Sequence, residues 1–171
     1  MLRDPWFRFA AVFAVLAVGC EILYYSLLVG SPSLSGYLRA LALVAAWVLE
    51  LLGTDAQVRY SVITTDVFAV EIAHGCDAIQ ICALYSSAVV AFPVSWRRRL
   101  WGLGLGVSWL QLLNQVRIVS LVLIGPAWPS YFETVHFKVW PSVLIVLTVG
   151  SWIAWARFAT RDVAQPEPSG A

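Results

Sequence analysis

Long stretches without a charged residue constrain this 171-residue chain more than any other feature. Charged residues are absent from residues 40–49, 78–96, 100–116, 118–132 and 139–156, and residues 9–38 contain only Glu21. A membrane span needs about 20 predominantly apolar residues, which most of these stretches approach. Of all residues, 60% are hydrophobic and 12% are charged, whereas a soluble domain carries about 25% charged residues. The sequence therefore predicts an all-α membrane protein, a small polytopic helical bundle.

The apolar pattern predicts five helices. Their expected ranges are about 6–29, 36–53, 76–95, 100–125 and 136–158. The second helix has charges near its ends, so four full spans with this helix partly inserted are preferred over five spans. A signal peptide is an alternative for the first helix, but Glu21 interrupts it and no small-residue cleavage site follows. Residues 1–161 are expected to form one domain, and the polar, Pro-rich residues 162–171 a disordered cytoplasmic tail.

Residues 58–72 have a pattern unlike that of the helical segments. Apolar residues alternate with other residues from Val58 to Val62 and again from Phe68 to Ile72. Period two on both sides of Thr64-Thr65-Asp66 predicts a β-hairpin. A hairpin does not span a bilayer by itself. It is therefore expected at the extracytoplasmic surface, directly before the helix that contains Cys76.

The arginine distribution predicts how the chain is oriented. Arg97-Arg98-Arg99 form the strongest positive cluster, and the positive-inside rule places that cluster in the cytoplasm. One return pass later, Arg157 and Arg161 also fall inside. Residues 54–75 and 126–135 are then expected outside the cytoplasmic membrane.

Arg117 lies in LLNQVRIVSLVL, with apolar residues on both sides. A charge inside a span costs at least about 2.5–3.5 kcal/mol on insertion scales, so it usually faces a partner or a wet cavity. Asn114 lies one turn earlier on the same helical face. The alternative is a structural arginine, which either forms an ion pair with Glu21 or Glu50 or extends its side chain to water at the membrane surface.

Cys76 is expected at the start of the third helix. A thiol near a helix N-terminus lies at the positive end of the helix dipole, which favours the thiolate. Gly75 permits a tight turn into the helix, and Gln80 shares the helical face of Cys76. Cys20 and Cys82 are expected to be inert packing residues. Three cysteines and two histidines form no close cluster, so no metal site is expected.

His136 lies at the outer start of the last helix, and His74 is a competing histidine two residues before Cys76. Arg117 precedes Gly125 by about eight residues, which places it roughly 12 Å below the outer end of its helix. Cys76, Arg117 and His136 are therefore expected to meet near the outer face. They supply a thiol nucleophile, a cationic stabiliser of an oxyanion and a proton-transfer partner.

Three segments, FAVEIAHGCDAIQ, NQVRIVSLVLIG and VHFKVW, together resemble the exosortase/archaeosortase family of membrane-embedded cysteine transpeptidases. The resemblance extends over residues 58–145. The short chain and the triple arginine after the Cys76 helix are most similar to the compact exosortase H type. The resemblance implies that Cys76 is the nucleophile, Arg117 the essential arginine and His136 the histidine. Supporting roles are expected for Gly75, Gln80 and Asn114.

The resemblance also implies a function. Exosortase-like enzymes cleave a C-terminal sorting signal at the outer membrane face and transfer the product to an envelope acceptor. The signal combines a short motif, such as a PEP-CTERM-like motif, with an apolar helix and a basic tail. Expected partners are such substrate proteins, membrane lipid and an unidentified acceptor. No cofactor is expected, and a net charge of +1 gives no basic field for nucleic acid.

Two other functions fit part of the sequence. A non-enzymatic membrane scaffold or assembly protein would use Arg117 as a structural ion-pair partner, and it would tolerate loss of the Cys76 sulfur. A membrane thiol oxidoreductase ranks last, because no CxxC pair exists. Cys76 and Cys82 would also lie about 240° apart around a helix.

Overall fold

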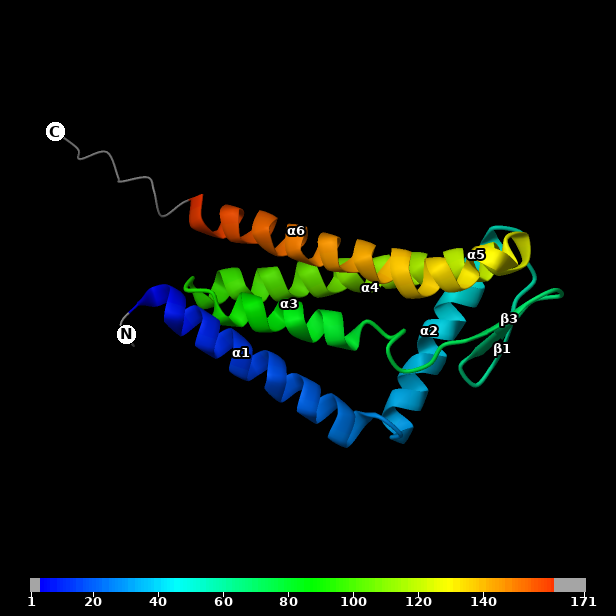
Figure 1. The fold of residues 1–171 in the computed structure, drawn as a ribbon, viewed down its shortest axis with the longest axis horizontal. Helices are drawn as coiled ribbons and strands as arrows, with labels where there is room; N and C mark the ends of the chain where they lie inside the picture. The colour runs from blue at the N-terminus through cyan, green and yellow to red at the C-terminus, as the bar shows by residue number, and fades with distance from the viewer. Residues whose placement is uncertain (1–3, 162–171) are drawn as a thin grey trace.

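Four helices run alongside one another in this computed structural model, which describes residues 4–161 (Figure 1). They are α1 (Pro5–Leu23), α3 (Ile79–Ala91), α4 (Trp96–Ala127) and α6 (Trp140–Arg161). The π-helical segment η1 (Tyr24–Leu28) continues α1, and α5 (Pro129–Thr134) with η2 (Val135–Val139) leads into α6. The expected tail, residues 162–171, lies outside the described residues.

The helix α2 (Pro32–Leu51) is inclined steeply to the other four and lies across the end of the bundle next to the sheet (Figure 1). By length and composition, four helical segments of the described chain can cross a membrane: α1 with η1, α2, α4, and α5 through α6. The fifth, α3, has only 13 residues. The prediction of a helical membrane bundle is confirmed.

Local sequence explains where the first two helices begin. The Asp4 side chain accepts a hydrogen bond from the Trp6 N–H (2.9 Å), and the Ser31 side chain accepts one from the Leu34 N–H (3.2 Å). Each of these caps precedes a proline at the first helical position, where a missing N–H costs nothing.

The predicted β region forms a three-stranded antiparallel sheet rather than a two-stranded hairpin. Its strands are β1 (Gln57–Arg59), β2 (Val62–Thr64) and β3 (Ala69–Glu71), in the order β1-β2-β3. A two-residue turn divides the first expected strand, and Tyr60 in that turn has a left-handed φ of 57°. The sheet therefore keeps its predicted place before α3 but contains one more turn than the sequence pattern indicated.

Two clusters of buried side chains hold these elements together. One lies between α2, α4 and the sheet and includes Leu49, Ile63 and Val122. The other lies between α3, α4 and α6 and includes Leu110 and Leu144. The first cluster fixes the sheet and α2 over α4, while the second fixes the three helices that surround the candidate site.

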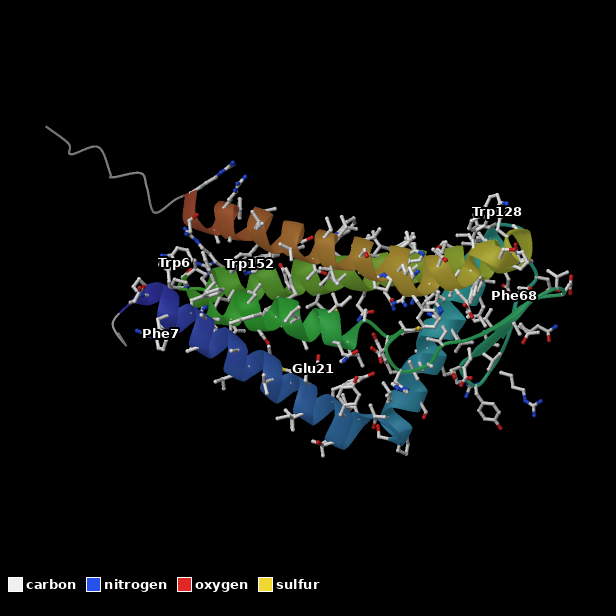
Figure 2. All side chains as sticks on the ribbon, viewed as in Figure 1. Trp6, Phe7, Glu21, Phe68, Trp128 and Trp152 are labelled. Carbon is white, nitrogen blue, oxygen red and sulfur yellow. The ribbon has the colours of Figure 1, made fainter. Side chains whose placement is uncertain are left out.

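Apolar side chains also cover the outside of the helices (Figure 2). Val15 on α1 and Val146 on α6 are 72% and 69% exposed, as expected for residues that face lipid rather than water. Trp6 lies near one end of the molecule and Trp128 near the other (Figure 2). Trp is enriched at both membrane–water interfaces, so these two residues are placed to mark the two faces.

Candidate active site

Cys76 lies on an irregular segment, residues 73–78, between the sheet and α3. Its N–H donates to the Ala73 carbonyl (3.0 Å) and closes a turn. Gly75 and Ala78, on either side of the Cys76–Asp77 pair, have φ of +85° and +59°. This left-handed conformation suits glycine and costs a residue with a Cβ about 1–2 kcal/mol. The backbone around the thiol is thus held in a conformation that the surrounding contacts must maintain.

Asp77 supplies those contacts. Its side chain is 1% exposed. The Tyr24 hydroxyl donates to Oδ2 (2.5 Å) and accepts from the Gly75 N–H (3.4 Å). The Ile79 N–H donates to Oδ1 (2.9 Å), so the same carboxylate caps the start of α3. The Tyr37 hydroxyl donates to the Asp77 carbonyl (3.1 Å). Asp77 therefore ties the Cys76 segment to η1, α2 and α3.

The imidazole of His136 contacts the thiol. His136 Nε2 lies 3.4 Å from Cys76 Sγ. The ring belongs to η2 and stacks on Phe137, with centroids 4.4 Å apart, and it contacts Phe132 at 5.7 Å. His74 is exposed, and within residues 4–161 no hydrogen bond joins it to the thiol. Of the two candidate histidines, His136 is the one positioned to exchange a proton with Cys76.

Arg117 and Asn114 reach the same segment from α4. Arg117 Nη2 lies 3.7 Å from Cys76 Sγ, and Asn114 Nδ2 donates to the Cys76 carbonyl (3.0 Å). The two side chains are 6% and 0% exposed. Arg117 Nε and Asn114 Oδ1 have no hydrogen-bond partner in the described part of the chain. Buried polar atoms are rarely unpaired, so these two unpaired atoms distinguish the surroundings of Cys76.

Glu21 and Glu50 do not form an ion pair with Arg117 among residues 4–161. Glu21 instead accepts a hydrogen bond from Gln80 Nε2 (2.9 Å), which also donates to the Tyr25 hydroxyl (3.3 Å). Glu50 is exposed. Gln80 therefore links α3 to α1 and makes no hydrogen bond to the thiol, although it lines a cavity together with Arg117.

The protonation of Cys76 differs from the sequence expectation. Cys76 precedes Ile79, the first residue of α3, by three residues, so the expectation that it begins this helix is wrong. Burial raises the pKa of the Cys76 thiol above its usual range, and the charge of Asp77 raises this pKa further. The Arg117 guanidinium and the backbone of Ala73 beside the sulfur lower this pKa but do not cancel the effect of burial. The resting group is a thiol, which must lose its proton before it acts as a nucleophile.

Sequence reasoning missed Asp77 and its two tyrosine partners. A carboxylate directly after a candidate nucleophile, in an otherwise apolar segment, was the available signal for Asp77. Tyr24 and Tyr37 carried no local signal, because they lie 53 and 40 residues before Asp77. Within residues 4–161, no group of three or more His, Cys, Asp or Glu side chains is placed to hold a metal ion.

This geometry defines a class of protein: a helical membrane protein with a cysteine, a histidine and an arginine gathered at one end of its bundle. The chain belongs to the transmembrane exosortase family, whose model matches residues 1–155. The searches of curated proteins and of solved structures found no match. Membership makes the chain a multi-pass membrane protein and supports a membrane transpeptidase-type role in general.

Proposed function

We propose that this chain is a cysteine transpeptidase that cleaves a C-terminal sorting signal at the outer face of the cytoplasmic membrane. The contact between Cys76 Sγ and His136 Nε2, with Arg117 Nη2 beside the same sulfur, is the observation that carries the proposal. Substrates are proteins that end in a short motif, an apolar helix and a basic tail. The cleaved product is transferred to an envelope acceptor.

In the first half of the reaction, His136 Nε2 takes the proton of the Cys76 thiol as the sulfur attacks the scissile carbonyl. The new C–S bond gives a tetrahedral oxyanion, which Arg117 stabilises with its guanidinium. The C–N bond then breaks, and His136 returns the proton to the leaving amine. A thioester of Cys76 with the substrate's N-terminal part remains, and the apolar helix with its basic tail departs.

In the second half, a nucleophilic group of the acceptor attacks the thioester carbonyl. His136 removes the proton from that group, and the C–S bond breaks to restore the Cys76 thiol. The acceptor is then joined to the substrate's new C-terminus. Water in place of the acceptor would give simple hydrolysis, with a free carboxylate as the product.

The length of α3 supports a site that lies just below the membrane surface. Its 13 residues cover about 20 Å at 1.5 Å per residue, whereas the hydrocarbon core is about 30 Å thick. If Arg97–Arg99 mark the cytoplasmic face, Cys76 falls within the outer leaflet. Irregular backbone is tolerated at that depth only where it is buried in protein or lines a wet cavity. Cys76 packs here against the cluster of α2, α4 and the sheet, and its neighbouring residues line two cavities.

The proposal is tested by removing the sulfur. We expect Cys76→Ala to abolish processing of a reporter protein that carries a host sorting signal, while the amount of enzyme in the membrane stays normal. Cys82→Ala is the matched control, because it removes a buried thiol from α3 without touching the site. Normal processing by Cys76→Ala would exclude the thiol mechanism and favour the scaffold alternative.

A further inference from the structure

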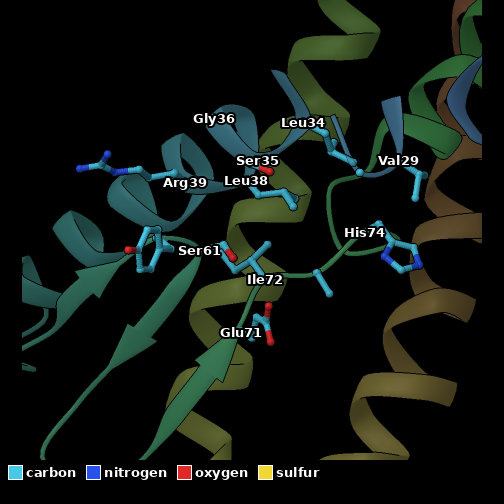
Figure 3. A pocket seen from close by; sticks show the side chains of 13 residues that line it. Val29, Leu34, Ser35, Gly36, Leu38, Arg39, Ser61, Glu71, Ile72 and His74 are labelled. Atoms are coloured by element: carbon cyan, nitrogen blue, oxygen red, sulfur yellow. The ribbon is translucent and has the colours of Figure 1, made fainter. Parts of the chain in front are cut away.

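The Cys76 segment separates two cavities. The larger, about 480 Å³, lies between α2 and the segment that runs from β3 into His74 (Figure 3); we name it the sheet cavity. The smaller, about 190 Å³, is lined by residues of α3, α4 and α6; we name it the bundle cavity. Ala73 and His74 line the sheet cavity, whereas Gly75, Asp77 and Ala78 line the bundle cavity.

Cys76 lies in sequence between the residues that line the two cavities, and it packs against residues of both linings or of the clusters they belong to. Cys76 packs against the buried cluster that includes Leu34, Leu38 and Ile72, and these three residues line the sheet cavity. On the other side, Arg117 contacts Cys76 Sγ and lines the bundle cavity. A peptide whose carbonyl carbon lies at the sulfur thus has one cavity on each side of its reacting bond.

The two cavities differ in character. The sheet cavity has an apolar floor and a rim that carries Arg39, Glu71 and His74, all of which are exposed. The bundle cavity has an apolar wall on α6, formed by Leu144 and Ile145. Ile145 is 59% exposed on the outside of the bundle, where lipid would lie. One cavity suits a polar chain that arrives from water, and the other suits apolar residues that arrive from the membrane.

A backbone feature adds to this difference. In the antiparallel sheet, β3 is an edge strand, and Glu71 faces Val62 of β2. The neighbouring residue Ile72 uses its N–H on the β2 side, in a bond to the Ser61 carbonyl. The alternation of an antiparallel ladder then directs the backbone N–H and C=O of Glu71 away from β2. Glu71 also lines the sheet cavity, and its free backbone groups are the ones that an added extended strand would pair with.

We propose that the sheet cavity binds the substrate residues on the N-terminal, acyl side of the scissile bond, and that the bundle cavity binds the apolar residues that begin the leaving helix. This inference rests on the function proposed above. A substrate that is water-soluble before the cleavage site and membrane-embedded after it fits the two cavities in one direction only. The cleavage site is thereby fixed at the boundary between motif and helix.

The assignment of the sheet cavity to the acyl side is tested with a reagent whose peptide lies only on the acyl side of the reacting carbon. An acetyl-tripeptide chloromethyl ketone carries its peptide on the acyl side of the reactive carbon. The Cys76 sulfur displaces chloride to form a thioether, and His136 accepts the thiol proton. The enzyme carries Cys20→Ser and Cys82→Ala, so that Cys76 is the one cysteine left in the chain. Iodoacetamide, which needs no subsite, measures how much thiol is reachable in each sample.

Ser35→Trp narrows the sheet cavity, and Ser33→Trp is its matched control on the same helix outside the cavity. We expect Ser35→Trp to slow labelling by the tripeptide reagent at least about tenfold, the effect of losing one side-chain subsite. Its labelling by iodoacetamide should equal that of Ser33→Trp. If iodoacetamide labels Ser35→Trp less than Ser33→Trp, the larger side chain has reduced access to Cys76 in general. Ser35→Leu, which adds less volume, is then used in its place. Equal tripeptide labelling of the cavity and control variants overturns the acyl-side assignment.

The leaving-side half is tested on α6. Ile145→Trp fills the bundle cavity, and Val146→Trp is the control at a lipid-facing neighbour. Ile145→Trp should label normally with both reagents, because neither reagent enters the bundle cavity. It should process the full reporter at least about tenfold more slowly than Val146→Trp. Equal processing by these two variants overturns the leaving-side assignment. Failure of the proposed function itself has another signature, which is processing of the reporter by Cys76→Ala.

Discussion

Two side chains of opposite charge, Arg117 and Asp77, lie beside the Cys76 thiol. Arg117 lowers the pKa of Cys76 and Asp77 raises it, while burial has the largest effect and raises it. In the proposed mechanism His136 takes the proton of Cys76, because a raised pKa leaves the thiol in need of a base. These three effects on the pKa of Cys76 determine how the reactivity of its thiol changes with pH.

The first prediction concerns that pH dependence. The rate of Cys76 alkylation follows the thiolate fraction, so it should level off at a higher pH than for a free thiol. Arg117→Gln removes a positive charge and should shift the profile to still higher pH. Asp77→Asn removes a negative charge and should shift it to lower pH. The profile of Glu50→Gln should match that of the unaltered enzyme. Shifts with the reverse signs would contradict this description of the site.

The second prediction separates catalysis from structure at Arg117. Lysine keeps the charge but loses the planar set of donors that matches an oxyanion. Arg117→Lys should reach the membrane in normal amount yet lose about 10²–10³ in turnover, as for removal of one oxyanion donor. Turnover per molecule and steady-state amount are measured together, with the exposed Arg59→Lys as control. A variant that is scarce but fully active per molecule would remove Arg117 from the catalytic set.

How far the site could be predicted depends on where each residue's signal lies. Cys76, Arg117 and His136 each stand out locally, as a thiol after glycine, a charge inside a span and a histidine at a helix start. The structure brings the three together, and their catalytic roles stay predictions. The position of Asp77 under Tyr24 follows from contacts between distant parts of the chain, which no local pattern encodes.

At the element scale, α4 approaches its neighbours closely through two glycines four residues apart. A Cβ at Gly106 would lie 2.2 Å from the Tyr85 ring of α3, and one at Gly102 would lie 2.3 Å from the Trp155 ring of α6. The Tyr85 hydroxyl also donates to the Gly102 carbonyl (3.1 Å). Small residues spaced this way allow membrane helices to pack tightly, so they position α3 and α6 on both sides of the site.

The third prediction follows from this packing. Gly106→Ala should destabilise the bundle by about 1–3 kcal/mol, because the new methyl group forces the Tyr85 ring to move. Gly104→Ala is the control on the same helix, since nothing lies within 4 Å of the Cβ it would add. Thermal unfolding in detergent should show a lower midpoint for Gly106→Ala alone. Equal midpoints for the two variants would argue against close packing of α3 on α4.

The turn between β1 and β2 and the start of α3 were not predicted from the sequence. The alternation of residues 58–72 located the β region correctly, but its first turn lacks the Gly or Asn that usually marks a two-residue turn. Tyr60 takes the left-handed conformation instead. The third-helix boundary failed for a related reason, because Ala78 adopts a left-handed conformation that its residue type does not suggest.

At the scale of the whole molecule, the basic end and the sheet end lie at opposite ends of the bundle (Figure 1). Arg97–Arg99 lie in the first turn of α4 at the basic end, whereas the sheet, α5 and the candidate site occupy the other end. The apolar periodicity was enough to predict the bundle. The steep inclination of α2 was not predictable in detail, because it depends on packing against α4 and the sheet.

The fourth prediction concerns which end of the bundle faces the cytoplasm. A reporter cysteine at Ser130 should react with a membrane-impermeant maleimide in intact cells, since residues 126–135 are expected outside. A reporter cysteine at Ser95 should react only after the cells are permeabilised, because residues 94–100 are expected in the cytoplasm. Both reporters are placed in a variant in which Cys20, Cys76 and Cys82 are all replaced, so that each reporter is the one cysteine in its chain. The reverse pattern would place the candidate site inside the cell and contradict the proposed function.

The central claim is that Cys76 forms a thioester with the substrate, and neutral hydroxylamine tests it most directly. Hydroxylamine attacks a thioester and leaves a hydroxamate at the substrate's new C-terminus, whereas direct hydrolysis leaves a carboxylate. We expect hydroxamate product, identified by mass spectrometry, with the unaltered enzyme and with Cys82→Ala. We expect no cleaved product with Cys76→Ala. Carboxylate product alone in the presence of hydroxylamine, or cleavage by Cys76→Ala, would contradict the central claim.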